Sequence, residues 1–100
     1  MVRGTTPTHI FTIPISVEDV KKVRVIYAQN DTKLFCKETE DCVLKENTVS
    51  VKLTQEETLL FDYKNCVEIQ LRVLTNDDVA LASFPMQVGV SRCLEDEVIE

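Results

Sequence analysis

The chain has 100 residues and a formal net charge of −6, with 11 lysines and arginines against 17 aspartates and glutamates. Its composition is 44 % hydrophobic and 28 % charged, with only 2 glycines and 3 prolines, which is typical of a single globular domain and argues against a disordered or fibrous chain. The negative charge argues against nucleic acid or an anionic membrane as a partner, because both require a basic surface.

The N-terminal segment, residues 1–7, lacks the apolar core of a secretory signal. No stretch approaches the ~18 consecutive apolar residues of a membrane helix. We therefore expect a cytoplasmic protein whose 4 cysteines are thiols. A bridge between Cys36 and Cys42 and two reduced thiols in small buried positions both fit the sequence. No zinc site is expected, because there is no C-x2-C pair and the single histidine lies far from the cysteines.

Residues 9–15 form the first expected strand, in which Phe11, Ile13 and Ile15 share one face. Pro14 has no N–H, so this strand should end near it or lie at a sheet edge. A capped helical turn should follow over residues 16–19, because the Ser16 hydroxyl can accept a hydrogen bond from a first-turn N–H.

Two strands, residues 23–29 and 33–37, should form a hairpin around the turn signal Asn30-Asp31-Thr32. A polar loop over residues 38–41, a short strand over 42–44 and a turn over 45–47 follow. Residues 48–53 alternate clearly and predict the next strand.

Thr54 and Glu57 have the spacing of a capping box, which predicts one helical turn. Leu59, Leu60 and Phe61 are expected to close one end of the core, and residues 62–65 to turn the chain.

The clearest strand is residues 66–74, where apolar and polar side chains alternate along the whole segment. A polar turn over residues 75–78 leads to a hairpin partner over 79–90. Pro85 interrupts that partner, so a bulge or a switch between sheets is expected there.

This pattern predicts an all-β fold of six to eight short strands with one or two helical turns. A two-sheet β-sandwich suits the pattern better than the alternative, a small open β-barrel. The whole chain, residues 1–100, is expected to be one domain, with an N-terminal arm over residues 1–8. An acidic C-terminal tail over residues 94–100 is expected to be frayed or docked on a partner.

No group of residues predicts a catalytic, cofactor-binding or metal site, and we expect no enzyme activity. His9 has no nucleophile or acid near it in sequence and is expected to face solvent. Cys66 has no basic neighbour to activate it. The acids of one loop lack the glycine of a calcium loop and are expected to be solvated; they are Glu38, Glu40, Asp41 and Glu46.

Apolar side chains also interrupt faces that would otherwise be polar; they are Ile26, Ala28, Ala80, Ala82 and Phe84. Exposed apolar residues of this kind often mark a protein partner. Coverage of both faces within the domain explains them equally well. Self-association through a sheet edge or an apolar face is a further prediction.

Several segments carry a resemblance that spans nearly the whole chain; they are Arg3–Phe11, Val25–Gln29, Val51–Thr58, Val67–Val73 and Leu94–Val98. Together they resemble a family of small proteins encoded by phages and prophages of Gram-positive gut bacteria, Clostridia especially. More loosely, the layout is similar to the N-terminal immunoglobulin-like domain of phage baseplate upper proteins.

The resemblance implies an immunoglobulin-like sandwich that serves as a structural or adaptor protein of the phage tail or baseplate. It would be made in the bacterial cytoplasm, become part of the virion, and bind other phage structural proteins through its arm and tail. It carries no catalytic residues. The alternative is a small host-side module that binds a protein or a peptide.

Overall fold

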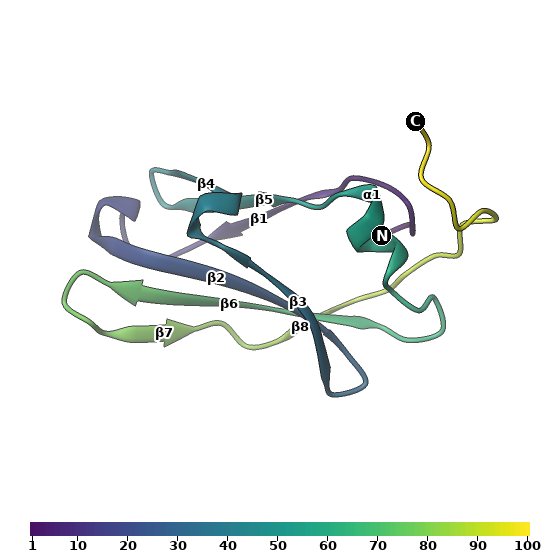
Figure 1. Ribbon diagram of the computed structural model, residues 1–100. Helices are drawn as coiled ribbons and strands as arrows, with labels where there is room; N and C mark the ends of the chain where they lie inside the picture. The colour runs from purple at the N-terminus through teal and green to yellow at the C-terminus, as the bar shows by residue number, and fades with distance from the viewer.

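The structure, a computed structural model, describes residues 1–100 and contains eight strands, one α-helix and two 3₁₀ turns. Two β-sheets face each other, with α1 at one end (Figure 1). The predicted two-sheet sandwich is therefore confirmed, and the open-barrel alternative is wrong. The elements are β1 (Thr8–Thr12), η1 (Val17–Asp19), β2 (Val20–Gln29), β3 (Thr32–Glu38), η2 (Thr39–Asp41), β4 (Cys42–Lys45), β5 (Thr48–Lys52), α1 (Gln55–Leu59), β6 (Val67–Thr75), β7 (Ala80–Ala82) and β8 (Met86–Val88).

The strand order identifies the type of sandwich. One sheet has three strands in the order β1-β5-β4, and the other has five in the order β3-β2-β6-β7, with β8 also paired to β6. All of these pairs are antiparallel. If β1 to β6 are read as strands B, C, C′, D, E and F, and β7 with β8 as G, the order is that of an immunoglobulin-like sandwich. No strand of this chain takes position A, beside β1.

Local sequence signals explain where the elements begin and turn. Asn30 and Asp31 have positive φ angles of 51° and 61°, the conformation that a two-residue hairpin between β2 and β3 requires. Ser16 caps η1 by accepting a hydrogen bond from the Glu18 N–H at 3.2 Å. The predicted capping box is also formed, because the Glu57 N–H donates to the Thr54 hydroxyl at 3.2 Å and the Thr54 N–H to the Glu57 carboxylate at 2.8 Å.

Two local predictions are wrong. Residues 39–41 form the 3₁₀ turn η2 instead of a loop, because the Glu38 N–H donates to the Asp41 carboxylate at 2.9 Å and closes the turn. Leu60 does not close the core: it is exposed, whereas Phe61 is buried. Leu60 is the C-cap residue of α1 and still helical, so its side chain and that of Phe61 point in different directions, one to solvent and one to the core.

The last predicted strand is divided, as Pro85 indicated. Its two parts, β7 and β8, pair with opposite halves of β6, so the break is a bulge within one sheet and not a switch between sheets. Ser83 pins the bulge: its N–H donates to the Leu71 carbonyl at 2.9 Å, and its hydroxyl accepts from the Leu71 N–H at 3.0 Å. The Gln70 amide donates to the Ser83 carbonyl at 2.9 Å.

The hydrophobic core lies between the sheets. It is a single cluster of 13 buried residues, most of them on the inward faces of β1, β2, β5 and β6. In β6 the alternation follows the predicted period of two, with Val67, Ile69, Leu71 and Val73 buried. In β1 the inward face carries His9 and Phe11, and Ile13 continues that face beyond the end of the strand.

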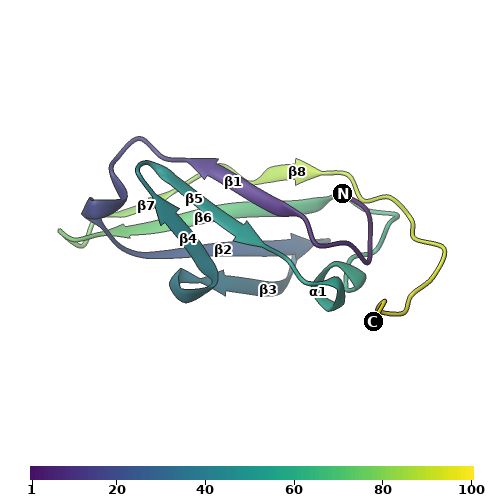
Figure 2. The same ribbon diagram turned by 90° about the horizontal axis from the view of Figure 1, so that it is seen from above.

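The N-terminal arm and the C-terminal tail contact each other within the molecule, and their expected docking on a partner stays a prediction. The N-terminal amine donates to the Gly89 carbonyl at 3.0 Å, and Val2 forms a parallel bridge with Ser91. The Arg3 guanidinium pairs with Asp96 at 2.7 Å and donates to the Leu59 carbonyl. Figure 2 shows the C-terminal segment passing the N-terminus after β8 and then curving back to end beside α1, where the Gln55 side chain binds the backbone of Ile99. The two ends of the chain are therefore held together by backbone hydrogen bonds and one ion pair.

Candidate functional site

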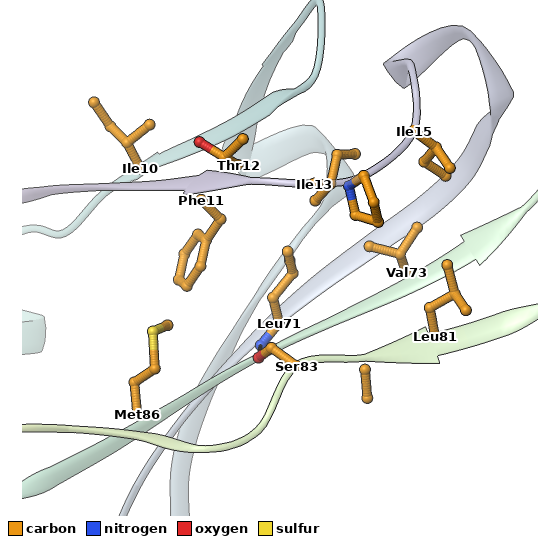
Figure 3. A pocket seen from close by; sticks show the side chains of 12 residues that line it. Ile10, Phe11, Thr12, Ile13, Ile15, Leu71, Val73, Leu81, Ser83 and Met86 are labelled. Atoms are coloured by element: carbon orange, nitrogen blue, oxygen red, sulfur yellow. Dashed lines mark hydrogen bonds between the residues drawn. The ribbon is translucent and has the colours of Figure 1, made fainter.

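An apolar groove lies between the edge of the three-stranded sheet and the edge of the five-stranded sheet. Its volume is about 440 Å³. Figure 3 shows Phe11 reaching down into it from β1, with Leu71 and Val73 of β6 on its floor and Met86 of β8 facing Phe11. The groove is lined by Ile10, Phe11, Thr12, Ile13, Pro14, Ile15, Leu71, Val73, Leu81, Ala82, Ser83 and Met86.

The rim formed by β1 has an unpaired backbone. The Leu53 N–H donates to the Pro7 carbonyl at 3.0 Å, and the Ile13 N–H to the Asn47 carbonyl at 2.8 Å, so the odd-numbered residues of β1 face β5. In an antiparallel pair the intervening residues direct their N–H and C=O groups away from the partner strand. The backbone groups of Thr8, Ile10 and Thr12 therefore point outward, along the edge where strand A lies in related sandwiches.

The opposite rim, formed by β7 and β8, presents Phe84. The bulge at Ser83 and Pro85 turns this phenyl ring away from the domain, and Phe84 is 92 % exposed. Ala80 and Ala82 of β7 are also exposed. By contrast, Ile26 and Ala28 of the central strand β2 are half-buried. For these apolar residues the sequence allowed either coverage within the domain or contact with a protein partner. The domain partly covers those of β2, whereas those of the β7–β8 edge remain exposed.

Neither rim of the groove carries a charge. Residues 4–17, which include β1, and residues 79–91, which include β7 and β8, contain no Asp, Glu, Lys or Arg, although 28 % of the chain is charged. The other sheet edges differ: β3 carries Lys33 and Lys37, and β4 ends at Lys45. Charges on an edge strand discourage pairing with another chain. The groove is therefore bordered by the uncharged edges of the molecule.

The one histidine points into the sandwich and is half-buried, so the prediction that it faces solvent is wrong. Its ring Nδ1 is 2.7 Å from the Tyr27 hydroxyl, which is fully buried against Phe35 and Phe61. Burial lowers the pKa of His9, and the nearby N-terminal amine lowers it further. A neutral imidazole can share a hydrogen bond with the Tyr27 hydroxyl in either tautomer, which makes this pair a part-buried structural contact.

The polar groups around Tyr27 are held in their unreactive forms. Burial raises the pKa of the Tyr27 hydroxyl well above its usual range, with smaller contributions from Cys42 and Glu57. Burial and the neighbouring acid Asp41 raise the pKa of the Cys42 thiol. Glu57 is bound to Lys37 at 2.7 Å. A protonated phenol and a protonated thiol are poor nucleophiles. The cluster thus favours packing over chemistry.

The remaining candidate residues are dispersed. Glu38 pairs with Arg24 at 3.0 Å, and Asp41 closes η2, so these two acids have structural roles. Cys66 is exposed, and all four cysteines are free thiols in the structure. No three His, Cys, Asp or Glu side chains lie close enough together to hold a metal ion. None of the helical segments has the length and apolar character needed to cross a lipid bilayer.

Comparison of the chain with protein-family models, with curated proteins and with solved structures gives no match. The resemblance to phage and prophage proteins therefore stays a prediction from the sequence. The groove was only partly foreseen: Ala80, Ala82 and Phe84 were singled out, but β1 was not. The two long uncharged runs, residues 4–17 and 79–91, are the signal in the sequence that would have pointed to both rims.

Proposed function

We propose that this protein is a non-enzymatic structural or adaptor protein of a phage or prophage, associated with the tail or baseplate. It acts through contacts with other phage structural proteins. The observation that carries the contact role is the apolar groove, which lies beside an uncharged strand with unpaired backbone groups. A strand edge of this kind is a template for pairing with another chain.

Charge and sequence support the same proposal. A net charge of −6 disfavours nucleic acid and anionic lipid as partners. Other proteins are then the main remaining class of partner. The segments that resemble phage proteins include β1 and β6, which form one rim and the floor of the groove. The protein would be made in the bacterial cytoplasm and become part of the virion through this groove.

Purified phage particles test this proposal. Mass spectrometry of particles made with a tagged copy of the protein should detect it together with tail or baseplate proteins. Leu81→Glu places a charge in the groove and should remove the protein from the particles. Val43→Glu is the matched control, because Val43 is exposed on β4, the opposite edge of the same sandwich, and this variant should be retained. Absence of the wild-type protein from particles and from complexes of phage proteins would overturn the proposal.

A host-side peptide-binding module is the second candidate, and the free edge of β1 favours it. An extended peptide could pair with the outward backbone groups of Thr8, Ile10 and Thr12 while its side chains enter the groove. A synthetic peptide of alternating valine and threonine should then bind in fluorescence polarisation. The same peptide with N-methyl groups on the bonding residues should not bind. Equal binding of both peptides would contradict strand pairing.

A further inference from the structure

Phe84 and the apolar groove lie side by side on one edge of the molecule. Phe84 is 92 % exposed, and the residues on either side of it, Ser83 and Pro85, form the bulge that turns it outward. Ser83 lines the groove, as does Met86 on the other side. An exposed phenyl ring next to an apolar hollow places both a projecting group and a receiving site on a single surface.

The groove has room for a phenyl ring. An apolar cavity of about 150 Å³ accommodates benzene, and the groove measures about 440 Å³. Phe84 cannot fill the groove of its own molecule, since its ring is directed away from the domain into solvent. The ring of another molecule can approach from outside, between β1 and the β7–β8 edge.

We propose that the occupant of this groove is a second copy of the same chain, with Phe84 of each copy inserted into the groove of the other. A two-fold interface brings the same patch of both copies together, and this patch carries both halves of the contact. This inference rests on the proposed function in one respect: both assign a contact role to the same groove.

The distribution of charge favours this surface for self-association, because the rims of the groove are uncharged. Each copy carries a net charge of −6, so two copies repel wherever their charged surfaces meet. The groove rims, residues 4–17 and 79–91, are the long uncharged runs of the chain. Contact at this edge keeps the acidic surfaces of both copies in water. The outward backbone groups of β1 lie at the same edge and can add hydrogen bonds between copies.

Sedimentation velocity of the full chain over a range of concentrations tests the proposal. The wild-type protein should show a reversible monomer–dimer equilibrium. Phe84→Ser should weaken dimerisation by about a hundredfold or more, because the burial of two phenyl rings is lost. Leu94→Ser is the matched control, since Leu94 is 91 % exposed in the C-terminal tail, and this variant should dimerise like the wild type. Unchanged thermal melting would show that both variants fold.

Mixing two variants tests the reciprocal geometry. Phe84→Ser retains the groove but lacks the ring, and Leu81→Glu retains the ring but has a charge in the groove. Each variant alone should be monomeric, and an equal mixture should form a heterodimer through the one intact contact. A wild-type protein that is monomeric at every concentration, a Phe84→Ser variant that dimerises normally, or a mixture that stays monomeric would each overturn the inference.

The outcomes for the two proposals are distinguishable. If the wild-type protein is monomeric but Leu81→Glu still removes it from phage particles, the groove binds a different phage protein and only the self-association is wrong. If the protein dimerises as expected but is absent from particles and phage complexes, the phage function is wrong and the self-association stands.

Discussion

Gln29 provides the sharpest test of how the structure is held together away from the groove. Its side chain is only 5 % exposed at the end of β2, yet it is polar. Its amide nitrogen donates to the carbonyls of Asp62 and Asn65 at 2.8 Å and 3.0 Å. Its amide oxygen accepts from the Asp62 N–H at 2.8 Å. One side chain therefore satisfies three backbone groups of the turn that leads from α1 into β6.

Gln29→Met removes these hydrogen bonds while keeping the length of the side chain. An intramolecular hydrogen bond contributes about 1 kcal/mol net, and a buried group that loses its partner costs at least as much. Three lost bonds, partly offset by the apolar burial of the methionine, predict a decrease of about 2–3 kcal/mol in the free energy of unfolding. A domain of this size has about 5–15 kcal/mol in total, so the variant should still fold but be clearly weakened.

Urea unfolding followed by circular dichroism measures this effect. With a slope of about 1–3 kcal/mol per molar urea, the midpoint should fall by about 1–3 M at an unchanged slope. Gln87→Met is the control, because Gln87 is exposed on β8 and makes no side-chain hydrogen bond. Gln87→Met should stay within about 0.5 kcal/mol of the wild type. A Gln29→Met variant equally close to the wild type would refute the role of Gln29 in fixing the turn.

Three further predictions concern the core, the bulge and pH. Ile69→Ala should cost about 2–5 kcal/mol, because Ile69 is buried on β6, whereas exposed Arg72→Ala should cost less than about 0.5; equal urea midpoints would contradict the facing of β6. Gln70 faces outward, but it donates to the bulge, so Gln70→Ala should cost about 0.5–1.5 kcal/mol and not the near-zero value of a free surface residue. The pKa of His9 is lowered in the folded state, so below its ordinary value of 6.5 only the unfolded chain takes up the proton, and stability should fall as pH falls. His9→Gln should flatten that slope in urea titrations between about pH 7 and 5.5; an identical slope in both proteins would contradict the assignment.

Local patterns in the sequence predicted most of the fold. The alternation along β6 gave its buried face because it depends only on residues within that strand. The Thr54 capping box and the Asn30-Asp31 turn were equally predictable, since a cap and a tight hairpin turn are each formed by neighbouring residues. Pro85 located the bulge for the same reason, because proline has no N–H to donate and is confined to edges, strand ends and bulges.

Contacts between distant segments could not be predicted in this way. His9 looked like a surface residue because its partner, the Tyr27 hydroxyl, belongs to the opposite sheet. The arm and tail looked free because Arg3 and Asp96 are at opposite ends of the chain. The groove needs β1 and β7 to lie at corresponding edges of different sheets, and strand order is a property of the whole fold.

The distribution of charge over the sheet edges is the strongest argument that the groove is a contact surface. An edge strand with a free backbone promotes aggregation unless charges, prolines or bulges protect it. In this protein β3 and β4 carry lysines, whereas β1 is protected only at its ends, by Pro7 and Pro14. If solubility alone governed these edges, β1 would be the first place to put a charge, since the β7–β8 edge is already interrupted by the bulge at Pro85. Introducing Lys at Ile10, which is 66 % exposed, should therefore leave the urea midpoint nearly unchanged and abolish contacts made through this edge. A lysine there that leaves those contacts intact would show that the uncharged edge has no role in binding.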